Sequence, residues 1–100
     1  MFGNLMNNIE QQQTQMKSKL SGIPVEITNQ GIRISGNALR KINNIEIDQN
    51  LFESNDKEML EDLLLAGFNE FIQAASAIEA AEAQQLMSSV LPGGLGDLFK

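Results

Sequence analysis

The first twenty residues place apolar side chains at the spacing of an α-helix. Asn, Gln and Lys residues occupy most of the remaining positions, so the helix would be amphipathic. Ser21-Gly22 should end it, because glycine is a common helix stop and Pro24 follows two residues later. Gln12 and Gln13 interrupt the apolar stripe, so this helix needs a partner surface. The apolar residues near one face are Leu5, Ile9, Met16 and Leu20.

After Pro24 the apolar period changes to two, which is the pattern of β-strands. Val25–Thr28 alternates, Asn29-Gln30-Gly31 supplies a turn, and Ile32–Ser35 alternates again. The β-branched residues in both segments favour strands over a helix. We therefore predict two short antiparallel strands joined by a tight turn.

A third strand follows a break at Gly36-Asn37-Ala38. Its apolar positions are Ile42, Ile45 and Ile47, and it ends at Asp48. The alternation slips near Asn43-Asn44, which predicts a β-bulge or a register change there. The three strands form an antiparallel meander with one apolar face. We expect the other face to carry Glu26, Thr28, Arg33, Ser35 and Glu46.

The second half of the chain predicts one long helix. Asn55 is a good N-cap, with Glu58 three residues later in the capping-box arrangement. No helix breaker occurs before Ser88-Ser89, so the helix would run for about 30 residues, or roughly 45 Å. Its apolar stripe consists of Leu60, Leu64, Phe68, Phe71, Ala75 and Ile78.

A helix of this length exceeds what three strands of one chain can cover. Small residues along it would also let another backbone approach closely, which favours a homodimer. These residues are Ala74, Ala75, Ala77, Ala80, Ala81 and Ala83. The prediction is a single α+β domain over residues 1–90, in α-β-β-β-α order, followed by a flexible Gly-rich tail over residues 91–100.

Composition excludes several kinds of chemistry. The 100 residues contain no Cys and no His, which removes disulfides, Cys/His zinc sites, thiol nucleophiles and His-based triads. The acids Glu58, Glu61 and Asp62 lie at a helix N-terminus, where the helix dipole already favours them. The glycines of Gly93-Gly94-Leu95-Gly96 follow a helix and not a strand, so they fail the context of a phosphate loop. We expect no enzyme activity, metal, cofactor or small-molecule substrate.

No stretch approaches the roughly 20 apolar residues that cross a membrane. The N-terminal segment also has no cationic stretch before an apolar block, so it is not a secretory signal. We therefore expect a cytoplasmic protein without a membrane partner.

The formal net charge of −6 is unevenly distributed. Residues 1–52 carry five basic and four acidic side chains, a net charge of +1. Residues 53–100 carry two basic and nine acidic ones, a net charge of −7. The first half is thus slightly positive, and two copies of it would form a modest anion-binding surface. The alternative is that these are ordinary solvated charges. The candidate nucleic-acid-binding residues are Lys17, Lys19, Arg33, Arg40 and Lys41.

Several segments occur in the same order as in one known family. The most specific is Asp56-Lys57-Glu58-Met59-Leu60-Glu61-Asp62-Leu63. On these residues the chain resembles the YbaB/EbfC family of bacterial nucleoid-associated DNA-binding proteins, over nearly its whole length. Directly after the middle strand, Ala38 and Arg40 stand where the family usually has glycines. The matching segments are Met1–Met6, Ile45–Asp48, Asp56–Leu63, Ala66–Glu70 and Leu91–Gly96.

The resemblance implies an intertwined homodimer shaped like tweezers that binds duplex DNA with limited sequence preference and associates with the nucleoid. It implies no catalytic or metal-binding residues. The leading hypothesis is therefore a dimer that contacts DNA phosphates through the basic residues of the first half. The alternative is a structural or protein-interaction dimer with little or no DNA affinity.

Overall fold

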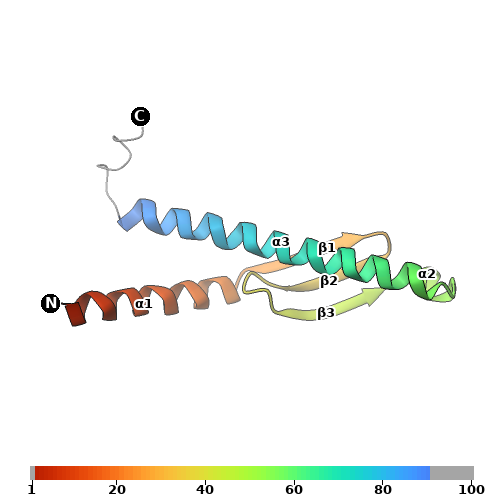
Figure 1. Cartoon of the computed structure of the whole chain (residues 1–100), viewed down its shortest axis with the longest axis horizontal. Coiled ribbons are helices and arrows are strands. Elements are labelled where there is room, and N and C mark those ends of the chain that lie inside the picture. Colours follow the sequence, from red (N-terminus) through yellow and green to blue (C-terminus); the bar gives the residue numbers. More distant parts are fainter. Residues whose placement is uncertain (1, 91–100) are drawn as a thin grey trace, which may run out of the picture.

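The structure is a computed structural model that describes the backbone of residues 2–90 and the side chains of residues 7–88. Its elements follow the predicted order, with one addition (Figure 1). They are α1 (Phe2–Ser21), β1 (Pro24–Asn29), β2 (Ile32–Asn37), β3 (Ile42–Ile47), α2 (Gln49–Glu53) and α3 (Lys57–Val90). The proposed tail of residues 91–100 and the side chain of Leu5 lie outside the described residues.

The three strands form the predicted antiparallel meander in the order β1-β2-β3. Gln30 and Gly31 both have positive φ, 48° and 92°, which suits the tight turn between β1 and β2. Between β2 and β3 the register shifts, because Ser35 pairs with Asn44 whereas Gly36 pairs with Ile42. Asn43 is therefore the extra residue of a bulge, and the prediction of a bulge at this point is confirmed.

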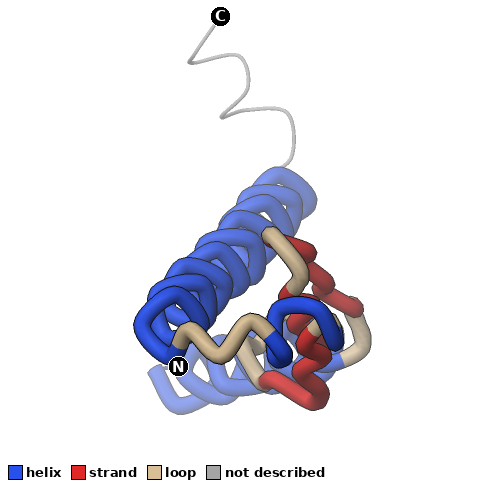
Figure 2. Tube along the Cα trace, turned by 90° about the vertical axis from the view of Figure 1, so that its right-hand side faces the viewer, coloured by secondary structure: helices blue, strands red, loops and turns tan. Residues whose placement is uncertain are grey.

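Helix α3 covers one face of the sheet, and the opposite face is open (Figure 2). Side chains from β2 and α3 form the centre of the core, where Ile32, Ile34 and Phe71 have no exposed surface. The two layers lie close together because two glycines occupy the contact. The ring of Phe71 packs over Gly36, and the tip of Ile34 reaches Gly67 of the helix.

Helices α1 and α3 both extend beyond the same end of the sheet (Figure 1). In α1 only the C-terminal end of the predicted apolar stripe is well covered, since Leu20 is buried and Met16 half-buried while Ile9 is exposed. In α3 the predicted stripe faces the sheet, with Phe71 and Ala75 fully buried. The alanines from Ala77 to Ala83 are exposed in the single chain.

The start of α3 differs from the prediction by one residue. The N-cap is Asp56, whose Oδ1 accepts a hydrogen bond from the backbone N–H of Met59 at 3.0 Å. Asn55 instead adopts a left-handed conformation with φ of 61°, which asparagine tolerates better than most residues. The expected capping box of Asn55 with Glu58 is therefore wrong, because two adjacent cap-forming residues compete for the same position.

Helix α2 was not expected from the sequence. It has five residues, which is less than two turns and too short to show a helical period. Leu51 is its one half-buried residue, and its side chain lies against Gly31 in the β1–β2 turn. This contact places α2 across the end of the sheet, where it leads the chain from β3 into α3.

Candidate nucleic-acid interface

The five candidate cations lie on three different elements. Lys17 and Lys19 are on the C-terminal half of α1, Arg33 is on β2, and Arg40 and Lys41 are in the turn between β2 and β3. All five are exposed. The structure thus distributes them along the junction of α1 with the sheet and onto the open sheet face.

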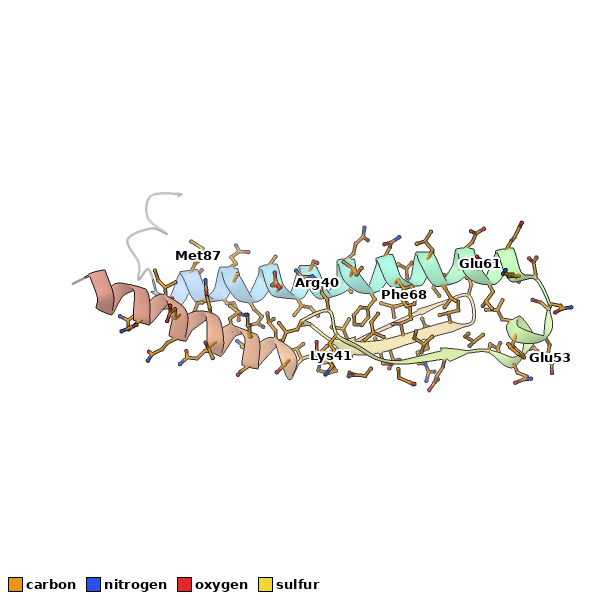
Figure 3. The ribbon with its side chains drawn as sticks, turned by 60° about the horizontal axis from the view of Figure 1, so that its bottom comes forward. Arg40, Lys41, Glu53, Glu61, Phe68 and Met87 are labelled. Carbon is orange, nitrogen blue, oxygen red and sulfur yellow. The ribbon has the colours of Figure 1, made fainter. Side chains whose placement is uncertain are left out.

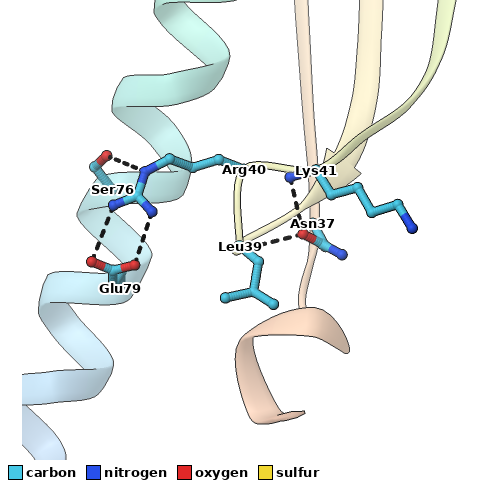
Figure 4. A network of polar contacts seen from close by, with 6 residues as sticks. All are labelled: Asn37, Leu39, Arg40, Lys41, Ser76 and Glu79. Carbon is cyan, nitrogen blue, oxygen red and sulfur yellow. Dashed lines mark hydrogen bonds and ion pairs between the residues drawn. The ribbon is translucent and has the colours of Figure 1, made fainter. Parts of the chain in front are cut away.

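The β2–β3 turn is held by one asparagine. The Asn37 side-chain oxygen accepts hydrogen bonds from the backbone N–H groups of Leu39 and Lys41, at 2.9 and 3.3 Å. Arg40 has a φ of 68°, and its N–H donates to the Asn37 carbonyl at 3.0 Å. As a result Arg40 extends towards α3 while Lys41 extends away from it (Figure 4).

The turn is also attached to the end of α1. Ala38, which is fully buried, donates its N–H to the carbonyls of Leu20 and Ile23 at 3.2 and 3.1 Å. Lys41 therefore lies near the C-terminal end of α1, the helix that carries Lys17 and Lys19 (Figure 3).

Arg40 is engaged by two residues of α3. Its Nη1 and Nη2 form a bidentate pair with the Glu79 carboxylate at 3.0 and 3.1 Å, and its Nε donates to the Ser76 hydroxyl at 3.3 Å (Figure 4). Both charged side chains remain 40% exposed. The sequence predicted Arg40 as a candidate contact but did not predict this acidic partner.

Lys19 is paired with the other acid on this part of α3. Its Nζ lies 2.5 Å from Oε2 of Glu82. The Glu82 side chain is only 19% exposed, and its Oε2 has no hydrogen bond apart from this ion pair. The ammonium of Lys19 thus provides the charge that a nearly buried carboxylate requires.

Arg33 lies between two acids on the open sheet face. Its Nη1 is 3.3 Å from Glu46 on β3, and its Nε is 3.6 Å from Glu26 on β1. These are cross-strand pairs of exposed side chains, which contribute little to stability. They do reduce the local positive charge of this face.

Lys17 and Lys41 differ from the other three candidates. Within residues 7–88, whose side chains the structure describes, neither ammonium forms an ion pair. Lys57, at the start of α3, is unpaired within the same range. The structure therefore separates the five candidates into three that face carboxylates and two that do not.

An open cleft of about 870 Å³ separates the projecting parts of α1 and α3. Its walls combine polar side chains with the apolar surface of Met16, Ala81 and Leu86, and the Lys19–Glu82 ion pair lies among the lining residues. Four glutamines contribute most of the other polar groups. These are Gln12 and Gln15 from α1, and Gln84 and Gln85 from α3.

The third strand is the least covered part of the sheet. Ile45 and Ile47 pair with the buried Ile34 and Ile32, so they belong to the face that α3 covers, yet both are exposed. On α3, Leu65 and Ile72 are also exposed, Leu65 by 62%. Since Leu65, Ile72 and Glu79 are spaced by seven residues, they share one flank of the helix. Glu79 binds the β2–β3 turn, so this flank faces the side of β3.

The structure gives no candidate for metal chemistry within its described part, where no three acids are grouped as metal ligands. The acids Glu58, Glu61 and Asp62 belong to this range and form no such group. No helix among the described residues is long and apolar enough to cross a membrane.

Two comparisons with known proteins agree with this fold. The model of the YbaB/EbfC DNA-binding family matches residues 1–90. A crystal structure of an uncharacterized protein, HP0035 from Helicobacter pylori, superposes with a TM-score of 0.70 at 20% sequence identity. The superposition covers 87% of this chain and 94% of that one, so the two proteins share a fold.

Proposed function

The chain belongs to the YbaB/EbfC DNA-binding family, and we propose that it binds duplex DNA as a homodimer through phosphate contacts, with little sequence preference. The family match over residues 1–90 is the observation that carries this proposal. The protein would act in the cytoplasm, associated with the nucleoid, and without catalysis. The absence of His and Cys from the sequence supports a non-catalytic role.

Lys17 and Lys41 are the principal phosphate contacts in this proposal. Both are exposed, and neither ammonium is neutralised by a carboxylate among the described side chains. Lysine ammonium groups bind phosphate as point charges and do not need a fixed geometry. Such contacts provide affinity on any sequence, since the phosphates carry no base information.

The homodimer would cover the apolar surface next to β3. Ile45 and Ile47 of the strand, with Leu65 and Ile72 of α3, present apolar side chains to solvent in the single chain. A second copy related by a two-fold axis would bring the same four residues against them, because a two-fold interface uses one patch twice. Two copies would also supply two sets of Lys17 and Lys41, which increases the attraction for DNA.

DNA binding is tested by fluorescence anisotropy on two duplexes of unrelated sequence at several salt concentrations. If Lys17 and Lys41 of both copies each neutralise one phosphate, log K should fall with log salt at a slope of about −3.6. Lys17→Glu with Lys41→Glu should weaken binding equally on both duplexes and flatten this slope. Lys57→Glu is the control, because it changes a lysine that is also exposed and unpaired but lies at the far end of α3. No binding by the wild type at the lowest salt would refute the proposal.

The homodimer is tested by light scattering. The expected mass is twice the 11.0 kDa of one chain. Ile45→Lys should shift the protein to the monomer, because it places a charge in the proposed interface. Thr28→Lys, on the exposed β1 edge, is the matched control and should leave the dimer intact. A wild-type protein that remains at the mass of one chain would rule out the homodimer.

A further inference from the structure

We propose that Glu79 and Glu82 of α3 compete with DNA for the basic surface, because they hold Arg40 and Lys19 in ion pairs that phosphates must displace. This inference rests on the proposed DNA binding and adds a property that limits its strength. Two of the acids of α3 would thus mask two of the cations in the first half of the chain.

The Arg40–Glu79 pair has the geometry of a competitor. A carboxylate that accepts two parallel hydrogen bonds from a guanidinium occupies the same donor fork that a phosphate would use. The distances of 3.0 and 3.1 Å, with Ser76 on the remaining Nε, leave Arg40 with few donors for another anion. Because both partners are 40% exposed, an incoming phosphate has access to the guanidinium.

The Lys19–Glu82 pair masks the second cation more firmly. The Glu82 carboxylate is mostly covered, so it retains Lys19 beside the cleft between α1 and α3. Lys17 lies two residues earlier on the same helix and has no such partner among the described side chains. The two lysines of α1 therefore differ in availability although their sequence context is similar.

The two acids act on one surface. Glu79 and Glu82 are three residues apart, so they lie on neighbouring turns of one helix face. That face is directed at the β2–β3 turn and at α1, where the cations of the first half are found. Glu61 belongs to the opposite end of α3, far from Arg40, and forms no ion pair among the described side chains (Figure 3).

The test compares the wild type with Glu79→Gln in the anisotropy assay described above. Releasing Arg40 should tighten DNA binding by about two- to fivefold per protomer, the range expected for one exposed ion pair. The salt slope should also steepen by about 0.9 per released cation, or roughly 1.8 for a dimer. Glu82→Gln should have the same direction of effect through Lys19.

Two controls separate local masking from a change in net charge. Glu61→Gln removes the same charge at a site without an ion pair, so it should give a smaller gain and leave the slope unchanged. In the second control, Glu79→Gln is combined with Gln73→Glu, which moves the carboxylate to an exposed position of α3 without changing the net charge. This relocated variant should keep most of the gain in affinity.

Adding Arg40→Ala to Glu79→Gln should abolish the gain, because the released cation is then absent. The inference is overturned if the wild type binds DNA and Glu79→Gln matches Glu61→Gln in both affinity and slope. If the wild type does not bind at the lowest salt, the proposed function fails and the masking fails with it. Circular dichroism monitors folding, and if Glu82→Gln unfolds the protein, the exposed Glu79 pair decides the outcome.

Discussion

Replacing Gly36 with alanine tests the close approach that connects the sheet, the β2–β3 turn and α3. A Cβ atom at this position would lie 1.9 Å from the Lys41 carbonyl oxygen, 2.7 Å from Cζ of Phe71 and 2.9 Å from Cα of Ile42. Two of these three atoms belong to the backbone, so no change of side-chain rotamer relieves them. The turn that presents Arg40 and Lys41 would have to move.

The cost follows from two opposing terms. Overpacking a core with one additional carbon typically destabilises by about 1–3 kcal/mol, and a backbone contact below 2 Å places Gly36→Ala at or above the upper end. Alanine recovers roughly 0.5–1 kcal/mol, because it has less conformational freedom than glycine in the unfolded chain. We therefore expect a net loss of about 2–3 kcal/mol, which corresponds to a melting temperature lower by about 10–20 °C for a domain of this size.

The assay is urea unfolding followed by circular dichroism. All variants are compared at one protomer concentration, because dimerisation makes the apparent stability depend on it. Adding Phe71→Leu to Gly36→Ala removes the ring contact but not the backbone contacts, so it should not restore stability.

Gly67→Ala is the matched control for this prediction. Its nearest neighbour would be Cδ1 of Ile34 at 3.0 Å, the flexible tip of a side chain. Since alanine in a helix interior is favoured over glycine by about 1 kcal/mol, Gly67→Ala should lie within roughly 1 kcal/mol of the wild type. If Gly36→Ala also lies within about 0.5 kcal/mol of the wild type, the reasoning from close approach is refuted.

Three further predictions concern the helix start, the core and the masking pair. Asp56→Ala should destabilise by about 1 kcal/mol in urea unfolding, because its carboxylate caps the N–H of Met59, and no change would mean that the cap is not formed. Phe71→Ala should cost about 3–5 kcal/mol by calorimetry, since its ring is fully buried, whereas Phe52→Ala, at an exposed position of α2, should cost less than about 0.5 kcal/mol. Arg40→Ala should cost less than about 1 kcal/mol, because its ion pair is exposed. If Arg40→Ala lowers the free energy of unfolding by more than about 2 kcal/mol, the Arg40–Glu79 pair is needed for folding, and this would contradict its displacement by DNA.

Local spacing in the sequence was sufficient for most of the secondary structure. Alternate residues of Ile32–Ser35 face opposite sides of any strand, and the seven-residue spacing of α3 defines its faces whatever lies against them. The slip between Ile42 and Ile45 was likewise visible as a break in alternation, and it became the bulge at Asn43.

The errors arose where local signals compete or are too short. Asn55 and Asp56 are both good N-caps, and only the backbone path from α2 decided that Asp56 takes this position while Asn55 turns left-handed. Helix α2 is shorter than two turns, so Leu51 alone could not indicate it. Its formation depends on the contact with the β1–β2 turn, which is distant in sequence.

The sequence by itself determined the order of every element except α2, the apolar faces, the exclusion of His and Cys chemistry and the concentration of negative charge in the second half. Only the tertiary structure decided which cations those acids reach. Arg40 and Glu79 are 39 residues apart in the sequence. Lys19 on α1 is paired with Glu82 on α3, across the cleft between the two helices. Periodicity is a property of one segment, whereas an ion pair needs two segments placed within 4 Å by packing. For that reason the two halves have separate net charges in the sequence but share a partly neutralised surface in the fold.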